Sequence, residues 1–150
     1  MRIFFDTCIL VDFLCNRKNA KQIERILNLT EEHLWEGFIS VGSFYTLTYL
    51  LELYLKREGC IDREERVSQL RLILTGILDS FHISDLDNVG LRTGVNNLSF
   101  LDLEDSYQFQ SAVNASCEVL LTDNLSDYKQ VDHSVMRILS PDRFIELFGS

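Results

Sequence analysis

Acidic side chains stand beside three apolar segments of this chain, where carboxylates could do chemistry. Asp6 interrupts the apolar run IFFDTCILVDFL, and Asp127 lies just beyond the apolar run EVLLT. A third group, Asp102, Glu104 and Asp105, opens the segment before EVLLT. A carboxylate is costly to remove from water unless it is paired or bound to a metal. Acids at the margins of buried segments therefore need a reason to be there.

Metal-assisted hydrolysis is the chemistry that such acids permit. Several carboxylates around one cavity cannot all stay ionised without a cation, because like charges raise one another's pKa. Oxygen-only ligands suit Mg²⁺ or Mn²⁺, which can activate a water molecule for in-line attack on a phosphodiester. Spacing alone leaves structural roles open, since Asp also caps helices and starts turns.

Strands and helices alternate along the sequence. Short apolar runs predict strands at residues 2–5, 37–40, 80–86, 118–122 and 135–139. Helical spacing and capping residues predict helices at residues 8–14, 18–29, 43–58, 62–78, 102–116 and 140–148. Because the strands are apolar on both faces, we expect an α/β fold with three layers, α/β/α, around a central parallel sheet of about four or five strands.

This arrangement predicts where the acids meet. Parallel sheets bind ligands beyond the carboxyl ends of their strands. Asp6 follows the first strand, and Asp123 and Asp127 follow the strand at 118–122. The helix at 102–116 leads into that strand and so begins at the same end of the sheet. We therefore expect the acids to converge.

Length and charge restrict the class of protein. A chain of 150 residues with 46% apolar residues and no linker is predicted to be a single domain, residues 1–150. The net charge of −9 argues against a passive phosphate-binding protein, although a cation-holding nuclease remains compatible with it. Four cations, Arg17, Lys18, Lys21 and Arg25, lie close together. Either a solvated helix face or a guide for a phosphodiester explains them.

Other classes of site find little support. The three histidines are far apart and lack Ser or Cys partners at triad spacing. The four cysteines form no CxxC pair, and free thiols among apolar neighbours are typical of a reducing cytosol, so we expect a cytoplasmic protein. No segment has the length of a transmembrane helix, and we expect no interaction with a membrane. The aromatics of residues 43–58 are expected to pack along a helix face: Phe44, Tyr45, Tyr49 and Tyr54.

Four stretches, in order, resemble the PIN-domain family of metal-dependent ribonucleases, which includes VapC-like toxins of bacterial toxin–antitoxin pairs. I-F-F-D-T-C-I-L-V-D-F-L resembles the family's first strand and its lead acid, and F-L-D-L-E-D-S-Y-Q-F-Q-S-A resembles its D-x-x-D-A helix start. V-L-L-T-D-N-L-S-D-Y resembles T-x-N-x-x-D-[F/Y], and I-L-S-P-D-R-F-I resembles the S-P-x-x-F ending. Each stretch alone is weakly specific, whereas the ordered set spans nearly the whole chain.

The resemblance implies a set of site residues. Asp6, Asp105 and Asp127 would be catalytic metal ligands for Mg²⁺ or Mn²⁺, with Asp102 as a further ligand. Three residues, Thr7, Thr122 and Asn124, would support them. Structural alternatives are a helix cap for Asp6 and Asp102, a helix-start acid for Asp105 and an exposed turn acid for Asp127. Asp12 is expected to act at a helix end or behind the ligands.

Two departures from the family pattern bear on activity. Cys8 stands where the family usually has Asn or Ser, and Thr46 stands where it usually has Glu. Glu52 lies six residues further on, roughly 9 Å along a helix, and would reach the site only if that helix began differently. Metal binding should therefore be weakened.

The resemblance implies an endoribonuclease that hydrolyses RNA, with a small antitoxin as partner and a homodimer as an open alternative for its assembly. A catalytically weak or inactive scaffold of the same fold, binding RNA or protein, is the second hypothesis. A phosphorylated receiver domain would share the sheet, but it needs a basic residue where Ser140 and Pro141 stand.

Overall fold

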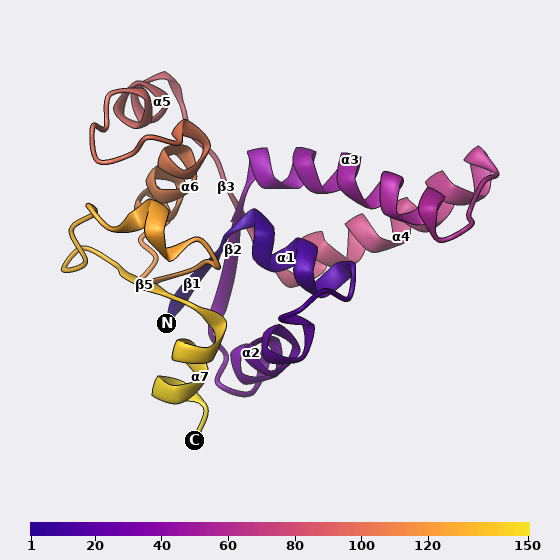
Figure 1. Cartoon of the computed structure of the whole chain (residues 1–150), viewed down its shortest axis with the longest axis horizontal. Coiled ribbons are helices and arrows are strands. Elements are labelled where there is room, and N and C mark those ends of the chain that lie inside the picture. The colour runs from indigo at the N-terminus through magenta and orange to yellow at the C-terminus, as the bar shows by residue number, and fades with distance from the viewer.

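A five-stranded parallel sheet forms the centre of the computed structural model, which describes residues 1–150 (Figure 1). Its strands are β1 (Arg2–Phe5), β2 (Glu36–Ser40), β3 (His82–Ser84), β4 (Val119–Leu121) and β5 (Arg137–Leu139). They pair in the order β3-β2-β1-β4-β5. The predicted α/β class and parallel sheet are confirmed.

Seven α-helices and one 3₁₀ helix connect the strands. The α-helices are α1 (Thr7–Leu14), α2 (Ala20–Glu32), α3 (Val41–Arg57), α4 (Arg63–Ser80), α5 (Asn88–Val95), α6 (Leu103–Asn114) and α7 (Pro141–Phe148), and the 3₁₀ helix is η1 (Leu125–Tyr128). In Figure 1, α3 and α4 form a long hairpin that projects from the body of the molecule. None of these helices has both the length and the apolar character needed to cross a membrane.

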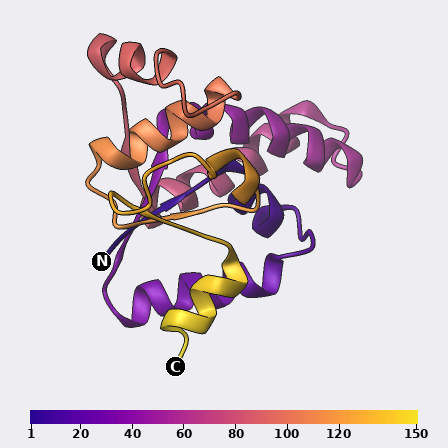
Figure 2. The ribbon, with the colours of Figure 1, turned by 60° about the vertical axis from the view of Figure 1, so that its left-hand side comes forward.

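Alternating side chains of the strands build a core on each face of the sheet. Ile3 and Phe5 belong to the larger core, which packs against α1, α2, α3, α4 and α7. Phe4, between them, belongs to the smaller core with Phe109 of α6 and Tyr128 of η1. Figure 2 shows α2 and α7 on one side of the sheet and α5 and α6 on the other. Both faces are covered, which explains the apolar runs of the central strands β1 and β4.

Capping residues begin and end the helices largely where expected. The Asp62 side chain accepts a hydrogen bond from the Glu65 N–H at the start of α4. Ser140 caps α7, with Pro141 at its first position. Gly59 follows α3 with a φ of +97°, a conformation that glycine adopts without strain.

The structure departs from the sequence analysis in three places. The predicted strand at 80–86 is a strand only at His82–Ser84, because α4 runs on to Ser80 and its last turn takes up the start of that segment. Helix α5 was not predicted, since it is short and has only one buried residue, Gly94. Tyr45 and Tyr49 are 70% and 64% exposed, so they do not pack along the helix face as expected.

The strand order fixes where a ligand can bind. From β1 the chain moves outward to β2 and β3, then returns to the other side of β1 with β4 and β5. The carboxyl ends of β1 and β4 therefore lie at the point where the order reverses, which is the usual binding site of such sheets.

We expect Leu47→Ala to destabilise the protein by about 2–5 kcal/mol, because Leu47 is fully buried between α3 and the sheet and its removal leaves a cavity. Leu72→Ala is the matched control, since Leu72 on α4 is 74% exposed and should change stability by less than about 0.5 kcal/mol. Urea unfolding followed by circular dichroism measures both. Equal losses for the two variants would contradict the assignment of the core.

Candidate functional site

Asp6 lies immediately after β1 and is only 4% exposed. One carboxylate oxygen, Oδ1, accepts hydrogen bonds from the Thr7 N–H at 2.8 Å and from Gln108 Nε2 at 3.0 Å. The other, Oδ2, accepts from Thr122 Oγ1 at 2.8 Å and from the Tyr128 hydroxyl at 3.4 Å. Asp6 is therefore both the N-cap of α1 and the centre of a buried polar network.

Gln108, on α6, connects this carboxylate to β2 and α3. Its amide nitrogen also donates to Thr7 Oγ1 at 3.0 Å and to Ser43 Oγ at 2.7 Å. Its amide oxygen accepts from Ser40 Oγ. Since Gln108 is 4% exposed, its hydrogen-bonding capacity is used inside the protein.

Thr122, directly after β4, contacts the second carboxylate oxygen of Asp6. Its hydroxyl donates to Asp6 and accepts from the Asn124 N–H at 3.0 Å. The Asn124 carbonyl in turn accepts from the Asp127 N–H at 3.0 Å. Thr122 and Asn124 thus shape the turn that presents Asp127, an exposed residue of η1.

Asp105 is the strongly perturbed acid of the site. Its pKa is raised from 3.8 to about 7, first by burial and then by the charges of Asp6 and Asp102. Hydrogen bonding with Asp127, and the charge of that residue, raise the pKa further. The structure therefore brings Asp6, Asp105 and Asp127 into one interacting group, as the strand ends predicted.

Asp102 and Thr7 both make hydrogen bonds at the margin of the acid group. Asp102 is the N-cap of α6 and accepts hydrogen bonds from the N–H groups of Glu104 and Asp105. This is the helix-cap alternative, although its charge still acts on Asp105. The Thr7 hydroxyl lies 2.6 Å from Ser43 Oγ and belongs to the Gln108 network.

The Cys8 thiol cannot replace the missing Asn or Ser as a strong partner. Burial, and then the charge of Asp6, raise its pKa to about 12, so it stays protonated at neutral pH. Its sulfur lies 3.8 Å from Asp6 Oδ2, which makes it a weak donor to that carboxylate.

Asp12 and Asp123 form a second acidic pair beside the first group. Asn19 Nδ2 donates to Asp123 Oδ2 at 2.6 Å and to Asp12 Oδ2 at 3.2 Å. Burial, and then hydrogen bonding and charge from Asp12, raise the pKa of Asp123. Asp12 therefore lies behind the acid group, near the end of α1, and fastens the α1–α2 turn to the loop after β4.

The structure keeps Glu52 out of the site. Helix α3 begins at Val41, and Glu52 Oε1 lies 3.5 Å from Arg66 Nε of α4. Thr46 instead lines a cavity of about 380 Å³ together with Ser43, Gln108 and Glu104. No carboxylate of α3 reaches Asp6.

A divalent cation suits the acid group in chemistry but not as a ready-made cage. All the atoms that could bind a cation are carboxylate oxygens. The raised pKa of Asp105 reflects burial and repulsion among the acids, and a cation would relieve that repulsion. Yet no three His, Cys, Asp or Glu side chains are grouped closely enough to hold a metal ion. Both oxygens of Asp6 face hydrogen-bond donors, which accounts for the lack of a three-ligand group.

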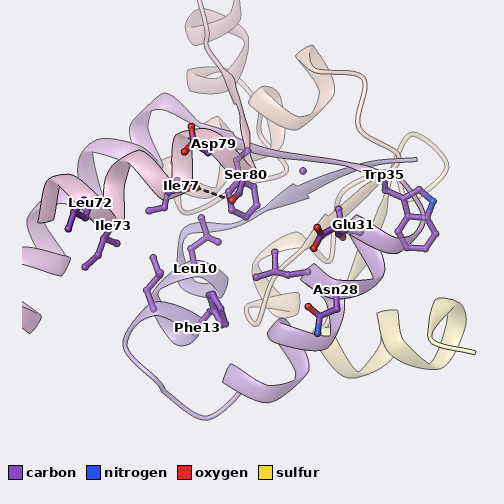
Figure 3. A pocket seen from close by; sticks show the side chains of 16 residues that line it. Leu10, Phe13, Asn28, Glu31, Trp35, Leu72, Ile73, Ile77, Asp79 and Ser80 are labelled. Atoms are coloured by element: carbon purple, nitrogen blue, oxygen red, sulfur yellow. Dashed lines mark hydrogen bonds between the residues drawn. The ribbon is translucent and has the colours of Figure 1, made fainter. Parts of the chain in front are cut away.

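A cavity larger than the one lined by Thr46 lies away from this chemistry. It measures about 710 Å³ and is lined by α1, α2 and α4, with Leu10, Phe13 and Ile77 among its walls (Figure 3). None of the acids predicted as ligands lines it. Cavity size is therefore a poor guide to the site here.

Gln108, Ser43, Ser40 and Tyr128 were missed by the sequence analysis. One signal for Gln108 was available: it lies three residues after Asp105 on the same helix, so the two side chains share a face. The serines gave no such signal, because Ser also caps helices, as Ser40 does for α3.

Comparisons with known proteins agree with the fold. A family model described as a PIN domain matches residues 2–126. A chain in the crystal structure of VapBC2 from Rickettsia felis, bound to a DNA fragment from their promoter, is 18% identical with a TM-score of 0.63; the match covers 93% of this chain and 98% of that one. A chain in a toxin–antitoxin complex from Klebsiella pneumoniae is 20% identical with a TM-score of 0.60, covering 93% and 97%. No curated protein sequence matches.

We expect the effect of Asp105→Asn on stability to grow with pH. The native Asp105 pKa of about 7 exceeds its ordinary value of 3.8, so the folded state binds more protons between these limits. The stability of the unmodified protein should therefore fall as pH rises from 4 to 7, and the variant should escape this loss. Its melting temperature should gain roughly 5 °C on the unmodified protein between about pH 5 and pH 8.

Calorimetric scans of both proteins, without divalent cations, measure this difference. Asp142→Asn, at an exposed acid of α7, is the control and should run parallel to the unmodified protein. A constant offset of Asp105→Asn across the range would contradict the repulsion described above.

Proposed function

Because the chain belongs to the PIN-domain family, we propose that it is a metal-dependent endoribonuclease that hydrolyses RNA phosphodiester bonds, and that it is the toxin of a toxin–antitoxin pair. The observation that carries this proposal is the acid group at the reversal point of the sheet, where Asp6, Asp105 and Asp127 interact. Of the three acids, only Asp6 has a structural role as a helix cap, at the start of α1. Helix capping therefore does not explain Asp105 and Asp127.

Asp105 and Asp127, with Asp6, would hold the Mg²⁺ or Mn²⁺ ion, and Asp102 would add charge at the rim. A bound ion of this kind makes water a better nucleophile and neutralises charge that develops on a phosphate. The protein's own part is to fix the acids. Gln108, Thr122 and Tyr128 orient Asp6, while Thr7 and Asn124 hold the turns on either side.

Partners and location follow from the same proposal. The two solved structures described above are a VapBC2 complex bound to DNA and a toxin–antitoxin complex, which supports an antitoxin partner for this chain. A net charge of −9 favours a partner that brings basic residues to the acid group. Four free cysteines are compatible with the cytoplasm.

A homodimer is also proposed. Apolar side chains are exposed on α5 and on the segment that follows it, including Val89, Val95, Leu98 and Leu101. A second copy of the chain would cover apolar side chains of this kind.

A catalytically weak or inactive scaffold is the second candidate. It is favoured by Thr46, by the absence of a ready-made three-ligand group, and by the hydrogen bonds that occupy both oxygens of Asp6. Cleavage of RNA distinguishes the two candidates.

We expect the purified protein to cleave a mixed RNA pool with Mn²⁺ and to stop when a chelator is added. Asp105→Asn and Asp127→Asn should lower the rate at least roughly 100-fold, because each removes a charge from the ion's binding group. Asp142→Asn should retain the full rate, since it changes charge equally at a distant helix. Gel electrophoresis of end-labelled RNA measures the rates. If a folded protein shows no cleavage that depends on these acids, the scaffold candidate replaces the nuclease.

Thr46→Glu should tighten Mn²⁺ binding by roughly tenfold, because it returns a carboxylate to the cavity wall beside Gln108 and Ser43. Tyr45→Glu is the matched control, since it adds the same charge to the same turn of α3 at a 70% exposed position. Isothermal titration calorimetry with Mn²⁺ gives both affinities. Equal gains would mean that net charge, rather than the position of Thr46, limits the site.

A further inference from the structure

A surface groove beside the acid group is lined by cations. It measures about 440 Å³ and is formed by the α1–α2 turn, the first turns of α2 and Ile145 of α7. Its basic residues are Arg17, Lys18, Lys21 and Arg25, all exposed. We call these residues and their surroundings the basic groove.

The cations of the basic groove are not used for stability. Ion pairs elsewhere in the structure join Arg2, Arg66 and Arg143 to acids, but none includes a cation of the groove. Among their side chains, only that of Arg25 makes a hydrogen bond, to the Gly149 carbonyl. In a protein with a net charge of −9, nearby unpaired cations are unusual. Lys21 and Arg25, four residues apart on α2, also repel each other, and a bound anion would relieve this repulsion.

Asn19 fixes the basic groove against the acid group. Its amide binds Asp123 at 2.6 Å, and Asp123 directly follows Thr122, whose hydroxyl binds Asp6. Lys18 is close enough to Asp123 to lower its pKa against the larger effect of burial. The groove is therefore held beside the acids by two partly buried hydrogen bonds of the Asn19 amide.

The start of α2 adds to the positive potential of the groove. Asn19 is the N-cap residue of α2, but its side chain makes no capping hydrogen bond because it binds the two acids instead. The helix dipole therefore ends beside Arg17 and Lys18 without a side-chain acceptor. An anion such as a phosphate is attracted to a helix start of this kind.

We propose that the basic groove binds the phosphate backbone of single-stranded RNA and leads the strand to the acid group. This inference rests on the proposed ribonuclease function and names where its substrate is held. Nothing in the groove presents an aromatic ring to a base, since its residues are Asn16, Arg17, Lys18, Ala20, Lys21, Gln22, Arg25 and Ile145. Binding there depends on charge and is insensitive to sequence.

The test is the binding of a fluorescent single-stranded RNA of about 20 nucleotides, measured by anisotropy in chelator at about 50–200 mM salt. The groove variant is Lys18→Ser with Lys21→Ser. The control is Arg63→Ser with Arg71→Ser, which removes the same charge from exposed residues in the first half of α4. All four side chains are exposed, so neither change should alter folding, and circular dichroism checks this.

We expect the groove variant to bind RNA roughly tenfold more weakly and the control to bind nearly as the unmodified protein does. The slope of log affinity against log salt should fall by about 1.4 in the groove variant, at about 0.7 for each lost phosphate contact. Equal losses in both variants, or no RNA binding by the unmodified protein, would overturn the inference. So would displacement of the RNA by a poly-aspartate peptide as effectively as by unlabelled RNA, since the groove would then bind acidic peptides generally.

The inference and the proposed function can fail separately because binding is measured without metal. If the unmodified protein cleaves RNA but the groove variant binds it normally, the nuclease stands and the groove assignment falls. If the groove variant loses binding while the unmodified protein never cleaves, the groove is an RNA site on an inactive scaffold.

Discussion

The burial of the Asp6 carboxylate is the constraint on which the rest of the site depends. A charge removed from water costs several kcal/mol unless donors replace the lost hydration. Those donors come from α1, α6, β4 and η1, so segments from both ends of the chain must meet at this point. The strand order makes this meeting easy, because β1 and β4 are neighbours and end together.

The side-chain donors that satisfy the Asp6 carboxylate do not serve Asp105. The side-chain donors of Gln108, Thr122 and Tyr128 all turn toward Asp6, whereas Asp105 is surrounded mainly by other carboxylates. Its charge is therefore balanced either by a proton or by a cation. Under the proposed function, pH and a bound cation would therefore act on the site through the same residue.

Much of this arrangement was predictable, and what was missed has a physical pattern. Apolar runs predict buried parallel strands. Parallel pairing then places Asp6 and Asp127 at the same edge of the sheet, and no other information is needed to predict this. Gln108 and Ser43 could not be found this way, because a polar residue on a helix is informative only when its buried neighbours are known. Helix α5 escaped because it buries almost nothing, and the exposure of Tyr45 depends on how α3 and α4 project from the body.

Asp6 and Asp12, the two acids of the first apolar run, lie in different parts of the site. Asp6 belongs to the group at the strand ends, while Asp12 faces Asn19 and, through it, Asp123. Without that contact the α1–α2 turn would have only its backbone hydrogen bonds to place it, and its cations would have no fixed relation to the acids. A surface that attracts phosphate and a centre that repels it can cooperate only if the distance between them is held. The hydrogen bonds of Asn19 to Asp12 and Asp123 hold that distance, which explains why an amide is buried at the start of α2.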